Sequence, residues 1–275
     1  MGTSWADPKS ALTLEGFHAK FSMFRRCLRA QIRWSGWIDD CLPARFRADG
    51  NRDFLDRVVP QHLHPGSMIY DVGGGKNPVV DRAVKQRLRL EVAGIDIDAA
   101  ELAAAPDGLY DRTICADITQ YRGAGDGDLV ICQALLEHVP DTGRALENIA
   151  GLLKPGGRAL VFIPSRNAVY ARLNLLLPER LKRWILFGIF PSMSRDHGFR
   201  AYYDLCTPRA IEKTARRCGL NVEERFLYYR SDYFRFFVPL HAIWRTWQML
   251  FHRLAGDEAA ETFTFVFRKS GRAQP

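Results

Sequence analysis

The chain has 275 residues, 47% of them hydrophobic and 12% aromatic, which suits one α/β domain with a sizeable core and an added lobe and argues against a second full domain. Its formal net charge of +8 is unevenly distributed, because residues 61–164 carry 10 basic and 14 acidic side chains whereas residues 165–275 carry 19 and 10. The basic C-terminal part indicates an anionic partner, such as a phosphorylated substrate, an anionic lipid or nucleic acid, or else a solvated basic surface.

The six cysteines are scattered without a Cys-x-x-Cys pair, and Cys115 and Cys132 fall within apolar runs. We therefore expect reduced, mostly buried thiols and neither a disulfide framework nor a metal site. The first residues show no basic region followed by an apolar run, and position six is Ala6 rather than the Ser or Thr that myristoylation prefers. These features predict a cytoplasmic protein.

Helical periodicity dominates residues 1–60. Gly16–Arg33 and Arg52–Val59 have helical character, and large apolar residues recur every three to four positions in the first stretch. We expect residues 1–60 to form a helical cap that packs over the opening of a binding site formed by the residues that follow.

An apolar strand, Met68–Val72, runs into a glycine turn at residues 73–75. Glycines allow positive φ and close approach of backbone amides to a ligand, while Asn77 can cap a helix that has Pro78 in its first position. This pattern is typical of a loop that binds a nucleotide cofactor at a helix start. Pro78 stands where the last glycine of a dinucleotide motif would fall, which argues against a nicotinamide cofactor.

Further apolar runs follow and end in acidic or polar residues. Val92–Asp98 contains Asp96, which follows Asp71 by 25 positions, close to where a dinucleotide fold places its ribose-binding acid. The runs that come next are Thr113–Ile118, Asp128–Val139 and, after Lys154-Pro155-Gly156-Gly157, Ala159–Pro164. Apolar strands thus alternate with helical segments.

This ordered set resembles class I S-adenosylmethionine-dependent methyltransferases, in particular the small-molecule branch that carries Leu-Glu-His after the fourth strand and Lys-Pro-Gly-Gly before the fifth. The resemblance covers roughly residues 68–164 and implies S-adenosylmethionine as cofactor and S-adenosylhomocysteine as its product. It implies that the first motif holds the methionine part, the acid after the second strand takes the ribose hydroxyls, and an Asp-hydrophobic pair after the third strand meets the adenine. The implied cofactor residues are Asp71, Gly73, Gly75, Asp96, Ile97, Asp117, Ile118 and Gln133. One departure is Asn77, which replaces the family's usual third glycine.

Helices are predicted over Thr142–Lys154 and over Thr207–Cys218, where Thr207 is the cap. Strands at Asn221–Tyr229 and Thr262–Arg268 would complete a Rossmann-like, doubly wound seven-stranded sheet, with the last strand antiparallel as the resemblance implies.

The domain plan is a cofactor-binding α/β core at residues 61–164, helical insertions at 165–203 and 231–260, and the C-terminal part of the sheet within 204–275. The insertions fall where open α/β sheets bind substrate. Both mix apolar surfaces with basic residues, and neither contains the run of about 20 apolar residues that a membrane span needs.

The insertions fit a lid, an interfacial helix pair, a homodimer interface, or cover for each other and the sheet. If they form a lid on the inner face of an anionic membrane, Trp184, Trp244 and Trp247 would lie at the interface. Lys182, Arg183, Arg235 and Arg245 would then meet lipid phosphates.

Methyl transfer needs little from side chains beyond alignment, exclusion of water and, for some acceptors, a base. His138 and His197 are the candidate bases, although His138 could instead fix its loop. Candidate acceptor residues are Arg200, Tyr202 and Tyr203, while Asp204 could shape the pocket or cap a turn. His241 and His252 sit among apolar residues and are expected to pack.

The acceptor class is narrowed by motifs that are missing. Residues Gln133-Ala134-Leu135-Leu136 replace the Asp/Asn-Pro-Pro-aromatic motif of DNA amino-methyltransferases, and no Pro-Cys nucleophile pair is present, so we expect no nucleic-acid substrate. The expected reaction is O- or C-methylation of a small-molecule, saccharide or lipid-linked acceptor. The alternative is a cofactor-binding scaffold or membrane-surface protein without catalysis.

Overall fold

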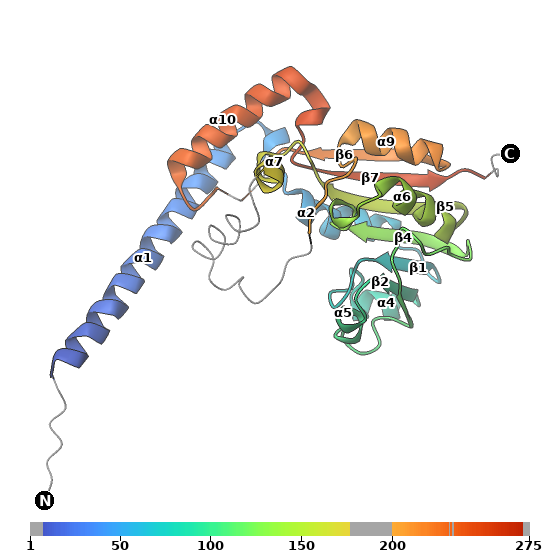
Figure 1. Ribbon diagram of the computed structural model, residues 1–275, viewed down its shortest axis with the longest axis horizontal. Helices are drawn as coiled ribbons and strands as arrows, with labels where there is room; N and C mark the ends of the chain where they lie inside the picture. The colour runs from blue at the N-terminus through green and yellow to red at the C-terminus, as the bar shows by residue number, and fades with distance from the viewer. Residues whose placement is uncertain (1–7, 177–199, 231, 233, 272–275) are drawn as a thin grey trace, which may run out of the picture.

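A seven-stranded sheet forms the centre of the computed structural model, which describes residues 8–176, 200–230, 232 and 234–271, with side chains from residue 25 onward (Figure 1). The strand order is β3-β2-β1-β4-β5-β7-β6. Every neighbouring pair is parallel except those made by β7, which runs antiparallel to β5 and β6. The strands are β1 (Met68–Val72), β2 (Glu91–Asp96), β3 (Arg112–Cys115), β4 (Gly127–Gln133), β5 (Leu153–Pro164), β6 (Leu220–Tyr228) and β7 (Thr262–Lys269). This confirms the predicted Rossmann-like sheet with its last strand antiparallel.

Helices cover both faces of the sheet. The α-helices are α1 (Pro8–Cys41), α2 (Gly50–Asp53), α3 (Val59–His62), α4 (Arg82–Leu88), α5 (Ala99–Ala103), α6 (Thr142–Leu152), α7 (Val169–Leu176), α9 (Pro208–Arg217) and α10 (Val238–Ala255). Residues of α6 and α9 share one buried cluster with Phe263, Phe265 and Phe267 of β7. Val266 points to the opposite face, where it joins the cluster of Phe54 and Val58, as the period-two alternation of a strand requires.

The helix after the glycine turn starts later than the sequence suggests. Asp81 is the N-cap of α4, and its side chain accepts a hydrogen bond from Val84 N at 2.8 Å. The expectation that Asn77 and Pro78 open this helix is therefore wrong. The buried Asp71 carboxylate accepts from Val79 N at 2.9 Å, so the loop must wrap around that side chain before the helix can begin.

The turn predicted at Pro155-Gly156 is also wrong, because β5 begins at Leu153, earlier than the predicted strand over Ala159–Pro164. Other predicted elements agree more closely. α6, α9, β6 and β7 lie within one or two residues of their predicted bounds, and the Thr207 side chain caps α9. The helix predicted over Gly16–Arg33 is part of the longer α1, which contacts α10 (Figure 1). α2 contacts the end of β4 through Asn51 and Gln133. None of the described helices is long and apolar enough to cross a lipid bilayer.

Two expectations about the second insertion are wrong. Trp244 and Arg245 were expected on a lipid-facing surface but are buried, because α10 packs this side against α1. Arg245 forms an ion pair with Asp39 of α1, and Arg235 also lies beside Asp39. His241 is buried in the same contact, as expected for a packing residue.

Some predicted residues lie outside the described part of the chain, namely Lys182, Arg183, Trp184 and His197. The cysteines also differ from expectation in one respect. Cys132 and Cys206 are buried, but Cys27, Cys41 and Cys115 are exposed, so the thiols are not mostly buried.

Candidate cofactor and acceptor site

A cavity of about 410 Å³ lies beyond the carboxyl ends of β1 to β4. β1 has β2 on one side and β4 on the other, so the cavity sits where the strand order reverses, the usual ligand position in open α/β sheets. Each strand contributes residues from the loop that follows it. The lining includes Gly73, Asp96, Ile97, Asp117, Ile118, Leu135, His138, Arg200 and Tyr202.

The glycine turn brings backbone to the cavity wall. Gly73 has φ +80° and donates its N–H to Ile95 O at 2.7 Å. A Cβ on Gly73 would lie 2.9 Å from Leu135 Cδ1, so any larger residue would push into the loop after β4. Gly75, with φ +48°, borders Asp96 Oδ2 rather than the cavity itself. The turn therefore needs glycine for conformation at both positions and for space at Gly73.

Asp71 organises this turn from beneath. Its side chain is buried, and Oδ2 accepts from Val79 N at 2.9 Å and from Tyr110 OH at 3.4 Å. Burial raises the pKa of Asp71 to about 6, and nearby Asp96 acts in the same direction. Asp71 is not among the cavity-lining residues, but its Oδ1 has no hydrogen-bond partner among the described residues.

Tyr110 is a site-supporting residue that the sequence reasoning missed. Its ring fills the space above Gly94, where a Cβ would lie 2.7 Å from the ring, and its hydroxyl lies beside Gly74. The usable signal was Gly94 inside a β-strand, since a strand glycine often marks a close approach by another group.

Asp96 presents a carboxylate at the end of β2. It is half-buried, and Asp98 N donates to its Oδ1 at 2.9 Å. Burial, with Asp98 and Glu101 nearby, raises the pKa of Asp96. A carboxylate held this way can accept hydrogen bonds from the two hydroxyls of a ribose.

Apolar residues line the neighbouring part of the cavity. Ile97 is 62% exposed although it is a large aliphatic residue, whereas Ile118 is buried at the cavity wall. Asp117 Oδ1 accepts from Thr119 N and Oγ1, both at 2.8 Å, which fixes the turn that carries Ile118. The glycine backbone, the Asp96 carboxylate and these apolar walls fit the methionine, ribose and adenine parts of S-adenosylmethionine.

The loop after β4 and residues 200–203 form the other side of the cavity. His138 Nδ1 lies 3.1 Å from Arg200 O, and Tyr202 N donates to Glu137 O at 2.7 Å. The Arg200 guanidinium carbon lies 5.1 Å from the centre of the Tyr202 ring. Asp204 anchors this segment by accepting from Thr142 N at 3.0 Å at the start of α6.

Three other predicted residues do not line the cavity. Gln133 Nε2 donates to Asn51 Oδ1 at 2.7 Å, which ties the segment of α2 to the end of β4. The Tyr203 side chain is packed in the core. Gly75 acts behind the turn, and His197 is outside the described residues.

Glu137 also escaped the sequence reasoning as a charged group of interest. It is buried, its Oε2 has no hydrogen-bond partner in the described chain, and burial raises its pKa to about 8. Its Oε1 lies 3.8 Å from His138 Nε2. The Leu-Glu-His motif identifies Glu137, but it does not show that the Glu137 side chain is buried.

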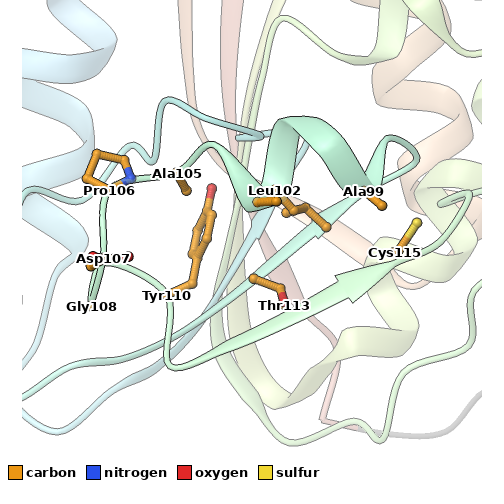
Figure 2. A pocket seen from close by; sticks show the side chains of 10 residues that line it. Ala99, Leu102, Ala105, Pro106, Asp107, Gly108, Tyr110, Thr113 and Cys115 are labelled. Carbon is orange, nitrogen blue, oxygen red and sulfur yellow. The ribbon is translucent and has the colours of Figure 1, made fainter.

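A second cavity, of about 370 Å³, lies beside α5 and β3 at the edge of the sheet (Figure 2). Its lining consists of α5, the loop through Asp107 and the outer side of Tyr110, and it includes neither the glycine turn nor Asp96. The first cavity is therefore the candidate cofactor site. In the described ranges no group of three or more His, Cys, Asp or Glu residues is arranged to hold a metal ion.

Comparisons with known proteins identify the family of the chain. A family described as a methyltransferase domain matches residues 44–225. The ubiquinone biosynthesis O-methyltransferase of Coxiella burnetii is 34% identical over 174 residues, covering 61% of this chain and 69% of that protein. The same-named protein of Cupriavidus pinatubonensis is 28% identical over 167 residues, covering 58% of this chain and 62% of the relative, so the match spans less than two thirds of the latter's length.

Solved structures show the same fold. The S-adenosylmethionine-dependent methyltransferase of Mesorhizobium loti superposes with a TM-score of 0.52 at 17% identity, covering 81% of this chain and 99% of that one. The Haemonchus contortus phosphoethanolamine N-methyltransferase 2, in complex with S-adenosyl-L-methionine, gives 0.51 at 17% identity over 87% of this chain and 56% of that one. With its glycine turn, acid and sheet topology in place, the chain belongs to the methyltransferase-domain family.

Proposed function

We propose that the protein transfers the methyl group of S-adenosylmethionine to a hydroxyl oxygen of a small-molecule acceptor. The observation that carries this proposal is that one cavity has the cofactor residues Gly73, Asp96 and Ile97 on one side and His138 on the other. The relatives named ubiquinone biosynthesis O-methyltransferases support oxygen as the acceptor atom. Saccharide and lipid-linked hydroxyls remain the finer alternatives for the acceptor.

S-Adenosylmethionine, when bound, supplies an activated methyl group, so the chain's own task is positioning and proton removal. Asp96 holds the ribose of the cofactor and Ile97 holds its adenine ring, while Tyr202 and Arg200 orient the acceptor. If His138 Nδ1–H donates to Arg200 O, its Nε2 is free of a proton and can take one from the acceptor hydroxyl. The imidazolium formed would lie 3.8 Å from Glu137 Oε1.

The test is methyl transfer from labelled S-adenosylmethionine to a panel of phenols, saccharide alcohols and lipid-linked alcohols, with the methylated atom located by mass spectrometry. We expect His138→Gln to lower kcat/KM by about 10²–10⁴-fold for a hydroxyl acceptor. His64→Gln, at an exposed histidine remote from the cavity, is the matched control.

His197→Gln belongs in the same series, because His197 remains the second candidate base. If His197→Gln lowers kcat/KM by that amount and His138→Gln does not, His197 rather than His138 is the general base. If S-adenosylhomocysteine binds but never forms with any acceptor, the non-catalytic scaffold becomes the better description.

A further inference from the structure

Arg200 brings a permanent positive charge to the wall of the first cavity. Among the described residues that line this cavity of about 410 Å³, it is the one Lys or Arg. Its guanidinium carbon lies 5.1 Å from the centre of the Tyr202 ring, and within the described part of the chain it forms no ion pair with a carboxylate. The N–H donors of the guanidinium are therefore left for a ligand.

The acidic side chains near Arg200 already have other partners or carry little charge. Asp204 accepts from Thr142 N at 3.0 Å, and Asp117 accepts from its own turn at 2.8 Å. Glu137 is buried, and burial raises its pKa to about 8, so this carboxyl is mainly protonated at pH 7. The positive charge of Arg200 is thus not neutralised by these groups.

The backbone of residues 200–205 is fixed in a conformation that presents Arg200 and Tyr202 to the cavity. Tyr202 N and Tyr203 N both donate to Glu137 O, at 2.7 and 3.0 Å. Tyr203 and Leu205 have φ +51° and +52°, a left-handed conformation that residues other than glycine adopt rarely. Strained backbone of this kind persists where surrounding contacts enforce it, and it is common at binding sites. Here it sends the Tyr203 side chain into the core while Arg200 and Tyr202 line the cavity.

Arg200 lies on the side of the cavity where we expect the acceptor. Its carbonyl oxygen lies 3.1 Å from Nδ1 of His138, the proposed base, in the loop after β4. The cofactor residues Asp96 and Ile97 follow β2, and β1 separates β2 from β4 in the sheet. Apolar lining from Leu135, Val139 and Pro140 accompanies the base and the guanidinium. This side of the cavity therefore combines a proton acceptor, an apolar wall and a cation.

We infer that the acceptor carries an anionic group, a carboxylate or a phosphate, separate from the hydroxyl that is methylated, and that Arg200 binds this group. The inference rests on the proposed methyl transfer and narrows its acceptor to a hydroxylated organic anion. Guanidinium forms two parallel hydrogen bonds with either anion, which orients the acceptor as well as holding it. With the anion on Arg200 and the apolar body on the wall, the hydroxyl can reach His138.

The experiment is isothermal titration calorimetry of the full chain saturated with S-adenosylhomocysteine. The probes are 4-hydroxybenzoate, 4-hydroxyphenyl phosphate and 4-hydroxybenzamide, the last of which has nearly the shape of the benzoate without its charge. We expect at least one of the two anions to bind about tenfold or more tightly than the amide, since hydrogen bonds between charged groups are the stronger ones. Comparison of the two anions shows whether the site prefers a carboxylate or a phosphate.

Substitution of Arg200 should remove this preference. Arg200→Gln should weaken binding of the preferred anion by about tenfold or more and change binding of the amide far less. Arg200→Lys should retain part of the preference, because lysine keeps the charge but lacks the planar fork of donors. Arg87→Gln, at an exposed arginine of α4 that does not line the cavity, is the matched control and should bind all three probes as the native chain does.

Two results would overturn the inference. The first is that neither anion binds the native chain more tightly than the amide. The second is that Arg200→Gln weakens S-adenosylhomocysteine but not 5′-methylthioadenosine, which lacks the amino-acid part, because the guanidinium would then hold the cofactor's own carboxylate. Circular dichroism of each variant checks the fold.

These binding measurements require no turnover. An anion preference that Arg200→Gln removes, in a chain that methylates no acceptor, would contradict the proposed reaction and leave the anion site in place. Where turnover is observed, Arg200→Gln should raise KM for the anionic acceptor more than it lowers kcat, as expected for loss of a binding contact.

Discussion

Three carboxylates near the cavity differ in environment, and the environment separates their roles. Asp71 and Glu137 are buried, and burial raises their pKa values to about 6 and about 8. Asp96 is half-buried at the cavity wall and keeps one oxygen beside the glycine turn. Asp71 shapes the loop after β1 and Glu137 lies in the loop after β4, whereas Asp96 lines the cavity and can meet a ligand.

Replacing Asp96 by Ala removes the acceptor for two ribose hydroxyls. We expect a loss of about 1.5–3 kcal/mol in the binding free energy of S-adenosylhomocysteine, the range for hydrogen bonds to a charged group, measured by isothermal titration calorimetry. Asp107→Ala, in the second cavity, is the control and should bind normally. The reverse pattern would place the cofactor beside α5 instead.

Glu137 should make the protein less stable as pH rises. Its pKa in the folded chain is raised from 4.5 to about 8, so the folded state holds a proton that the unfolded state releases between these values. The free energy of unfolding therefore falls with increasing pH across that window. Glu137→Gln removes this contribution, and its stability relative to the native chain should be greater at pH 8 than at pH 5.

Urea unfolding at both pH values measures this difference. Glu91→Gln, an exposed residue at the start of β2, is the control and should show the same relative stability at the two pH values. An unchanged difference for Glu137→Gln would show that the carboxyl is solvated in solution.

At the scale of elements, the buried acid Asp39 joins α1 to α10. Asp39 lies 2.9 Å from Arg245 Nε, 3.0 Å from His241 Nε2 and 3.7 Å from Arg235 Nε. Gln31 and Ser35 of α1 add hydrogen bonds to Val238 N and Arg235 O. These contacts are directional and polar, so removal of the Asp39 carboxylate leaves its buried partners without their charge.

Asp39→Ala would leave Arg245 buried without its carboxylate. We expect the free energy of opening the contact between α1 and α10 to fall by about 3–5 kcal/mol, the usual effect of removing one partner of a buried ion pair. Hydrogen exchange along α1 and α10 measures it directly. Asp40→Ala, the exposed neighbour, should have almost no effect.

At the scale of the whole molecule, α10 starts from the same edge of the sheet at which the cavity lies. β6 pairs antiparallel with β7, and β7 pairs antiparallel with β5, so β6 ends at the edge where β1 to β4 open into the cavity. α10 follows β6 along the chain and so starts from that edge. Asp39→Ala should nevertheless leave S-adenosylhomocysteine affinity unchanged, because Asp39 does not line the cavity.

The sequence determined the seven strands, because alternation of apolar residues and glycine turns are local signals, whereas the antiparallel direction of β7 was implied by the resemblance to class I methyltransferases. The resemblance predicted Gly73, Asp96, Ile97, Asp117 and Ile118 as a set, and the structure brings all five to one cavity because the carboxyl ends of parallel strands meet at one edge. Gln133 and Tyr203 carried no such signal: whether a side chain faces the cavity, a neighbouring segment or the core depends on contacts made far along the chain.

The tertiary structure alone decided the orientation of α10. Periodicity shows that a helix has two unlike faces, but it does not show which face is covered, and the usual assumption buries the apolar one. Here Asp39, about 200 residues earlier in the chain, pairs with His241 and Arg245 and draws the polar face inward. Charge pairing across that distance is invisible to local patterns, and it leaves Trp247 and its apolar neighbours exposed.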